Sequence, residues 1–89
     1  MIKIVRAEPI RNRIIRLEFS DGSSGDYDLA PLIARGTSLT SMLADDAYFG
    51  RFFLELGALS WPNGFELAPA AIHQQLKDRG ALKARPRVA

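Results

Sequence analysis

The sequence of 89 residues contains no cysteine and only one histidine, and both absences exclude kinds of chemistry. Without cysteine the protein has no disulfide framework, no thiolate nucleophile, and no cysteine-ligated zinc or iron–sulfur cluster, so we expect a cytoplasmic protein. A single imidazole excludes metal sites that are built from several histidines. We therefore expect neither a metal nor any other cofactor.

Long hydrophobic runs are also missing, because no apolar run exceeds four residues. A membrane-spanning helix needs about 18 apolar residues. No charged and then apolar leader precedes a small-residue cleavage site, so we expect neither a membrane protein nor a secreted one. The sequence has no glycine-rich phosphate loop and no G-x-S-x-G elbow, which makes nucleotide hydrolysis and serine-hydrolase chemistry unexpected.

Hydrophobic residues make up 47% of the chain, and the length suffices for one small core. No repeat or linker divides the sequence. We predict a single α+β domain over residues 1–79, followed by a basic and flexible tail over residues 80–89. The tail alternates lysine or arginine with small residues and proline, which gives too little apolar area to offset the entropy of ordering.

The net charge of +2 conceals an uneven distribution. Residues 1–20 carry five basic and two acidic side chains, which gives +3. Residues 21–76 carry two basic and seven acidic side chains, and residues 77–89 five basic and one acidic, which gives −5 and +4. Basic ends therefore flank an acidic middle, and such ends attract acidic partners.

Alternating apolar residues predict two strands near residues 2–8 and 13–19, with a turn from Pro9 to Asn12 between them. Asp21-Gly22 is a turn dipeptide, and residues 25–29 then form a short third strand. The chain therefore opens as an antiparallel meander.

Pro31 is suited to begin a short helical segment that Gly36 ends, and Asp45 is suited to cap the next helix. A later hairpin is predicted over residues 52–61. In it Phe52, Leu54 and Leu56 share one strand face and Gly57 turns the chain.

A C-terminal helix is predicted from Pro69 to Gly80, with Ile72 and Leu76 as an i,i+4 apolar pair. The expected fold is α+β, with short helices packed on a small antiparallel sheet. Phe49, one of Phe52 and Phe53, and Trp61 are expected in the core, because so short a chain needs its large rings there.

The most informative motif is Trp61-Pro62-Asn63-Gly64, which predicts a tight turn anchored by one large aromatic side chain. Three more motifs precede it in order: F-x-D-G from Phe19, D-L-x-P-L from Asp28, and L-x-D-x-x-x-F from Leu43. Together they resemble the small bacterial family of domains of unknown function that is numbered 2442, over roughly residues 2–76.

The resemblance implies an α+β domain without assigned catalytic residues. Genes for such proteins often lie beside a gene for another small protein, in an arrangement like a toxin–antitoxin pair, and some longer members add a helix-turn-helix domain. The family pattern usually has aspartate where Glu66 stands here. The role of a carboxylate at that position is therefore open.

Candidate catalytic groups are few. Asp26 and Asp28 share one face of a strand, and with Asp21 and Glu66 they suggest a cation site or an acid–base pair. The simpler interpretation, turn capping and a solvated strand face, is favoured. His73 is interpreted as a surface or cap residue rather than a general base.

The leading hypothesis is therefore a non-enzymatic protein-interaction module, the antitoxin-like or accessory partner of a small neighbouring protein. The alternative is a nucleic-acid-binding regulator that uses the basic tail, and a small enzyme is the third possibility. A sheet edge left by the meander also permits pairing with a second copy. The candidate contact residues are Arg11, Arg13, Lys77, Arg79, Lys83, Arg85 and Arg87.

Overall fold

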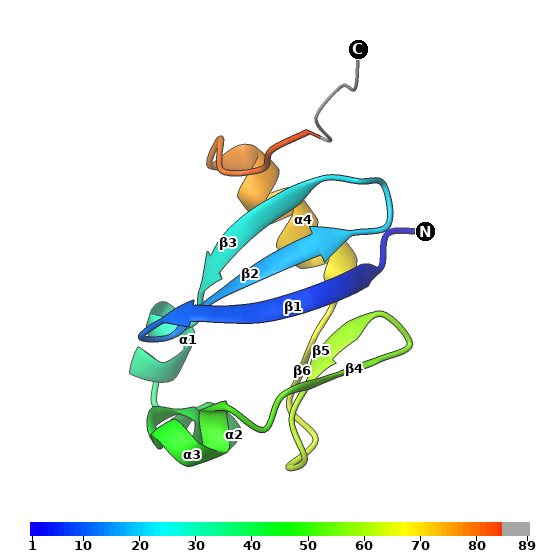
Figure 1. Cartoon of the computed structure of the whole chain (residues 1–89). Helices are drawn as coiled ribbons and strands as arrows, with labels where there is room; N and C mark the ends of the chain where they lie inside the picture. Colours follow the sequence, from blue (N-terminus) through cyan, green and yellow to red (C-terminus); the bar gives the residue numbers. More distant parts are fainter. Residues whose placement is uncertain (85–89) are drawn as a thin grey trace.

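The computed structural model describes residues 1–84 and contains two antiparallel sheets of three strands each (Figure 1). The first sheet is a meander of β1 (Ile4–Arg11), β2 (Ile14–Phe19) and β3 (Ser24–Asp28). The second contains β4 (Phe53–Glu55), β5 (Ala58–Ser60) and β6 (Glu66–Leu67). The predicted α+β fold and its opening meander are confirmed, whereas β6 was not predicted.

Strand β2 shows why the sequence forms this sheet. Ile15, Leu17 and Phe19 are at most 1% exposed, whereas Arg16 and Glu18 between them are exposed. The buried face is covered by α4 (Pro69–Asp78), which lies behind the sheet in Figure 1. Each fully buried aliphatic side chain contributes about 1.5–3 kcal/mol to the stability of the fold, so burial of this face stabilises the packing of α4 on the sheet.

The predicted turn from Pro9 to Asn12 is wrong in its start, because β1 continues to Arg11. The odd-numbered residues of β2 direct their backbone N–H and C=O groups towards β3, as the hydrogen bond from Phe19 N–H to the Ser23 carbonyl shows. Pro9 lies opposite Ile15, so its backbone points away from β2 and its missing N–H removes no bond of the ladder. Asn12 makes the turn, with a φ of 48° that asparagine tolerates.

Short helices connect the two sheets: α1 (Ala30–Ala34), α2 (Ser38–Ser41), the 3₁₀ helix η1 (Met42–Ala44) and α3 (Asp46–Phe49). Pro31 stands in the first turn of α1, and the Asp45 carboxylate caps α3 by accepting from Tyr48 N–H at 2.9 Å. Both predicted helix starts are confirmed. Neither α2 nor η1 was predicted; Thr37 caps α2 by accepting from Thr40 N–H at 3.3 Å.

The predicted aromatic core is confirmed. Phe49 and Trp61 are 5% and 1% exposed, and the indole N–H of Trp61 donates to the Phe49 carbonyl at 3.0 Å. Phe52 packs against this core, whereas Phe53 is 42% exposed. The shared face predicted for Phe52, Leu54 and Leu56 is wrong, because β4 starts at Phe53 and Leu56 belongs to the turn.

After α4 the chain returns to the first sheet. Lys83 exchanges two backbone hydrogen bonds with Ser24, of 2.9 and 2.7 Å, at the outer edge of β3. The predicted flexible tail spans residues 80–89, and its last five residues lie outside the described part of the chain. Over residues 1–84, no helix has the length and apolarity to cross a membrane.

Candidate interaction surface

The tip of the β4–β5 hairpin exposes an apolar side chain on a strained backbone. Glu55 pairs with Ala58, so Leu56 and Gly57 form a two-residue loop. Their φ angles of 50° and 85° are those of a type I′ turn, in which asparagine, aspartate or glycine is usual at the first position. A left-handed leucine costs about 1–2 kcal/mol. Leu56 is nevertheless 91% exposed, so no packing of its side chain offsets this cost.

The hairpin tip is held firmly against the first sheet. Ile4 N–H donates to the Gly57 carbonyl at 2.9 Å. A Cβ atom at Gly57 would lie 2.6 Å from Cβ of Lys3, so only glycine fits this approach. Two further apolar residues are exposed: Met1, which precedes β1, and Phe53, which begins β4. The tip therefore presents Leu56 from a fixed backbone.

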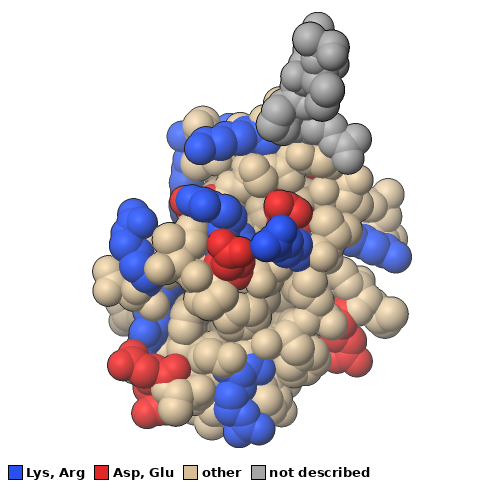
Figure 2. Space-filling model, viewed as in Figure 1, with Lys and Arg blue, Asp and Glu red and all other residues tan. Residues whose placement is uncertain are grey.

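The outer face of the first sheet is a lattice of alternating charges (Figure 2). Across the strands Arg6 lies opposite Glu18, Glu8 opposite Arg16, and Arg16 opposite Asp26. The side chains of Arg6 and Glu8 form an ion pair of 3.2 Å, and those of Arg16 and Asp26 one of 2.9 Å. Exposed ion pairs of this kind add little stability to the fold.

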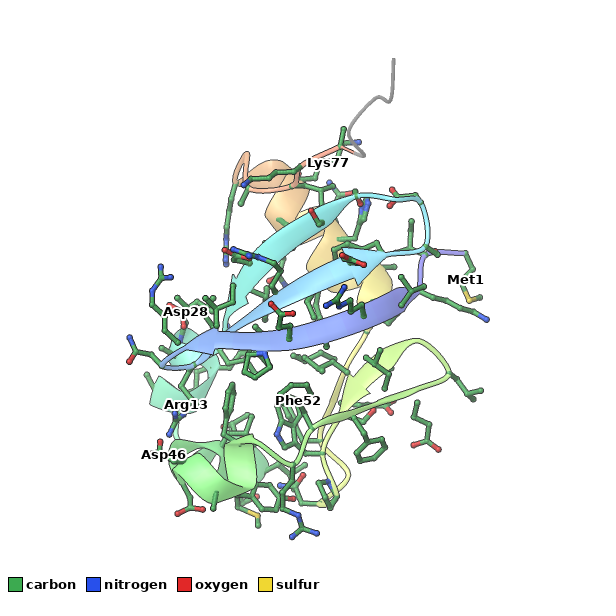
Figure 3. The ribbon with its side chains drawn as sticks, in the orientation of Figure 1. Met1, Arg13, Asp28, Asp46, Phe52 and Lys77 are labelled. Atoms are coloured by element: carbon green, nitrogen blue, oxygen red, sulfur yellow. The ribbon has the colours of Figure 1, made fainter. Side chains whose placement is uncertain are left out.

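Arg13 was a candidate contact residue, and the structure places it in a partly buried position between the first sheet and the short helices. Figure 3 shows it at the β1–β2 turn, pointing towards α3. Its guanidinium donates to the carbonyls of Leu43 at 2.9 Å and Ala44 at 2.7 Å and to the carboxylate of Asp46 at 2.6 Å. It also lies 4.9 Å from the ring centroid of Phe49. With a side chain only 19% exposed, Arg13 ties η1 and α3 to the first sheet.

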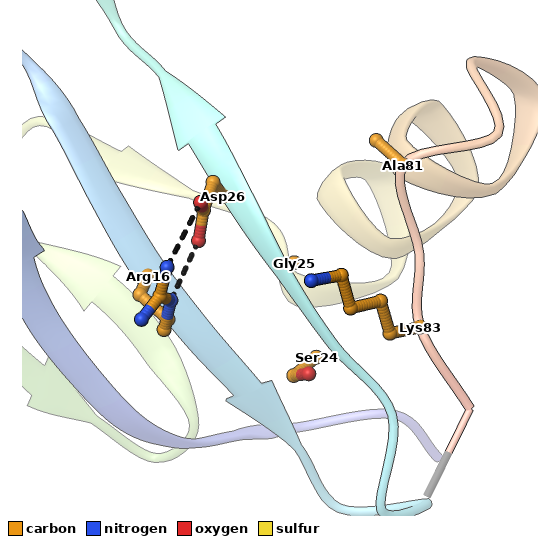
Figure 4. A pocket seen from close by; sticks show the side chains of 6 residues that line it. All are labelled: Arg16, Ser24, Gly25, Asp26, Ala81 and Lys83. Carbon is orange, nitrogen blue, oxygen red and sulfur yellow. Dashed lines mark hydrogen bonds and ion pairs between the residues drawn. The ribbon is translucent and has the colours of Figure 1, made fainter.

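The other candidate cations that the structure describes lie in three places. Arg11 is exposed at the end of β1, and Lys77 and Arg79 are exposed at the C-terminal end of α4. Burial raises the pKa of Tyr27, and the positive charges of Arg79 and Arg35 oppose that shift. Lys83 lies at the edge of β3 (Figure 4), and Arg85 and Arg87 fall outside the described residues.

The W-P-N-G turn joins separate elements. Gly64 N–H donates to the Trp61 carbonyl at 3.0 Å, and Gly64 has a φ of 93°, as the motif predicts. Asn63 donates from its backbone to the hydroxyl of Tyr48 at 2.7 Å and from its side chain to the carbonyl of Leu39 at 3.2 Å. The motif therefore fixes the turn against α2 and α3.

Asp21 and His73 meet, although they are far apart in sequence. Nε2 of His73 lies 2.9 Å from Oδ2 of Asp21, and the ring packs edge-on against Phe19 at 5.0 Å. The Ser23 hydroxyl bonds to the other oxygen of the same carboxylate. The hydroxyl and the imidazole thus face one carboxylate rather than each other, and the cluster ties the β2–β3 turn to α4. The His73 side chain is 16% exposed, so it lies partly buried beside Asp21.

The remaining carboxylates do not converge. Asp26 pairs with Arg16, Asp28 accepts from Ala30 N–H at 2.9 Å ahead of α1, and Glu66 lies in the second sheet. Over residues 1–84 no three side chains of the metal-ligating types come together.

A protein-family model described as "Protein of unknown function (DUF2442)" matches residues 4–77. This chain belongs to the DUF2442 family. The match ends within α4, so the DUF2442 domain contains both sheets and the hairpin tip. No curated protein and no solved structure matches the chain.

Sequence reasoning missed the hairpin tip because it extended the strand to Leu56. The signal was present, since Leu56-Gly57 separates two short segments of strand character. A two-residue turn there would have placed the leucine in the loop.

Proposed function

We propose that this DUF2442 chain is a non-enzymatic protein-interaction module of the cytoplasm, with Leu56 at the centre of its contact surface. The observation that supports this most is the fully displayed, left-handed leucine at the hairpin tip. Strained residues persist where function requires them. Burial of a leucine side chain in a partner yields about 1.5–3 kcal/mol.

The fixed backbone of the tip favours binding. Contacts from Gly57 to Ile4 and Lys3 hold the loop before any partner arrives. A preorganised loop avoids part of the entropy cost of association. The charged lattice of the first sheet supplies a polar surface for orientation and for the rate of encounter.

We propose a small protein encoded next to this chain as the partner, with this chain as the antitoxin-like or accessory half. The test is co-expression of both proteins, size-exclusion chromatography at moderate salt, and calorimetric measurement of the dissociation constant. Leu56→Asn is expected to weaken binding at least about tenfold, as for a residue at the centre of an interface.

Leu39→Asn is the matched control, because Leu39 is another exposed leucine, 41% exposed, on α2. It should leave the dissociation constant nearly unchanged. Separate elution of the two proteins at micromolar concentration would contradict the proposal. So would a Leu56→Asn variant that binds as tightly as the wild type.

A nucleic-acid-binding regulator is the second candidate, and the exposed Arg79 at the C-terminal end of α4 favours it. Lys77 extends the same basic end of α4, and the tail adds Lys83, Arg85 and Arg87. This function predicts binding to duplex DNA that weakens steeply with salt. Glutamine at the three tail cations should remove most of the affinity, and unchanged affinity would reject the tail as the binding arm.

A further inference from the structure

The W-P-N-G turn contains an Asn-Gly pair, Asn63-Gly64, at the end of the molecule that α2 and α3 occupy (Figure 1). An asparagine before glycine is prone to lose its side-chain amide in water, because no Cβ atom hinders the glycine nitrogen from attacking that amide. The only other asparagine, Asn12, precedes Arg13, whose side chain hinders the same attack. A reactive asparagine therefore lies within the turn.

The reaction needs no reagent besides water. The backbone nitrogen of Gly64 gives up its proton and bonds to Cγ of Asn63, the Cγ–Nδ2 bond breaks, and ammonia leaves. Water then opens the resulting cyclic imide at one of its two carbonyls. The product is aspartate, or isoaspartate in which the main chain runs through Cβ, and neither product has the Nδ2 donor of asparagine.

The folded turn restrains the attacking nitrogen. Gly64 N–H donates to the Trp61 carbonyl at 3.0 Å, so the proton that must leave is engaged in a hydrogen bond. Asn63 N–H donates to the Tyr48 hydroxyl at 2.7 Å, which fixes the backbone just before the attacking nitrogen. Beyond its chain neighbours, no atom lies within 4 Å of the place for a Cβ at Gly64. Hydrogen bonds, rather than close packing, therefore restrain this nitrogen.

The attacked amide is restrained as well. Oδ1 of Asn63 accepts from Phe65 N–H at 3.0 Å. Nδ2 donates to the Leu39 carbonyl and lies close to Sδ of Met42, both at 3.2 Å. Attack makes Cγ tetrahedral and moves Oδ1 and Nδ2 away from these partners. The loss of their hydrogen bonds adds to the barrier of the reaction in the folded state.

We propose that Asn63 is a deamidation site that the fold protects and that reacts when the W-P-N-G turn detaches from α2 and α3. Local opening of this kind needs less free energy than complete unfolding. The opening is reversible, whereas the loss of ammonia is not. Each opening therefore exposes Asn63 to a permanent change.

Deamidation removes the link between the turn and α2. An aspartate at position 63 still accepts from Phe65 N–H, but it has no donor for the Leu39 carbonyl and places a negative charge beside that oxygen. Isoaspartate adds the Cβ atom to the main chain of a tight turn. The modified chain cannot rebuild the link, so a transient opening becomes a lasting one.

The test is peptide mapping by mass spectrometry of the full chain during incubation at mildly alkaline pH, in native buffer and in concentrated guanidinium chloride. In denaturant we expect Asn63 to convert to aspartate and isoaspartate, and Asn12 to convert far more slowly. In native buffer we expect the conversion of Asn63 to be at least about tenfold slower than in denaturant.

Tyr48→Phe tests whether detachment of the turn controls the reaction. It removes the hydroxyl that accepts from Asn63 N–H, so conversion in native buffer should become about two- to tenfold faster. Tyr27→Phe is the matched control, because it removes a hydroxyl that donates to Gln75 at 3.0 Å, between β3 and α4. It should leave the native rate nearly unchanged, and neither variant should change the rate in denaturant.

Conversion of Asn63 as fast in native buffer as in denaturant would overturn the proposed protection. No acceleration by Tyr48→Phe, or an equal acceleration by Tyr27→Phe, would overturn the control by the turn. Conversion of Asn12 as fast as that of Asn63 in denaturant would overturn the assignment to the Asn-Gly pair. The first comparison uses the wild-type chain and needs no variant to fold. The test involves neither a partner nor Leu56, so its outcome is independent of the proposed function.

Discussion

At the scale of single residues, one side chain in the W-P-N-G turn holds three parts of the chain together. The Asn63 amide reaches the carbonyl of Leu39, and its oxygen accepts from Phe65 N–H at 3.0 Å. Proline and glycine set the turn, but only asparagine provides a donor and an acceptor at this distance. The turn therefore links the second sheet to α2 through the side chain of Asn63.

Asn63→Ala should lower the free energy of unfolding by about 1–2 kcal/mol, because it leaves the Leu39 carbonyl and Phe65 N–H without these partners. Urea unfolding followed by circular dichroism measures the change. Asn12→Gly is the control, because glycine keeps the left-handed turn at a φ of 48° and should change little. Equal effects of both variants would contradict the bracing role.

The Asp21 carboxylate predicts loss of stability in acid. Hydrogen bonds from the Ser23 hydroxyl and N–H, with a smaller contribution from His73, lower the pKa of Asp21 from 3.8 to about 2. A carboxyl whose pKa is lower in the folded state stabilises the fold above its unfolded pKa and loses this contribution as the pH falls. The free energy of unfolding should therefore fall between about pH 4 and pH 2.

Asp21→Asn should flatten this part of the pH dependence, as measured by urea unfolding at several pH values. An unchanged slope in the variant would show that other carboxyls account for the loss.

At the scale of elements, the approach of α4 to β3 depends on a missing side chain. A Cβ atom at Gly25 would lie 2.9 Å from Cδ1 of Leu76 and 3.0 Å from the Ala81 carbonyl oxygen. Leu76 itself is 1% exposed. The glycine therefore lets the helix and the segment after it lie close against the strand.

Gly25→Ala should destabilise the fold by about 1–3 kcal/mol through overpacking. Leu76→Ala should cost about 2–5 kcal/mol, and the double variant should cost less than the sum, because alanine at 76 makes room. Gly50→Ala is the control, since its φ is −69° and its nearest neighbours lie at 3.7 Å. Strict additivity in urea unfolding would contradict this contact.

The sequence predicted those elements that depend only on residues close together in the chain. The alternation at Ile15, Leu17 and Phe19 needs only a sheet with one buried face, and the cap at Asp45 needs only its own helix. The site could not be predicted in the same way. Arg13 is a surface cation by sequence, and its partners Leu43 and Ala44 lie 30 and 31 residues away.

At the scale of the whole molecule, the fold mixes charges that the sequence separates. The basic first segment meets the acidic middle where Arg16 pairs with Asp26 and where Arg13 pairs with Asp46. Antiparallel pairing of β2 with β3 produces the first contact and the β1–β2 turn the second. The outer face of the first sheet is therefore a lattice of both signs, and further exposed cations lie at the end of α4.

The central claim is that Leu56 serves a contact outside the chain and costs stability within it. The most direct measurement is the free energy of unfolding of Leu56→Asn in urea, without any partner. Asparagine accepts the left-handed turn, and Leu56 is 91% exposed, so we predict a rise of about 1 kcal/mol. A fall in the free energy of unfolding would show that the leucine stabilises the fold itself and would contradict the account.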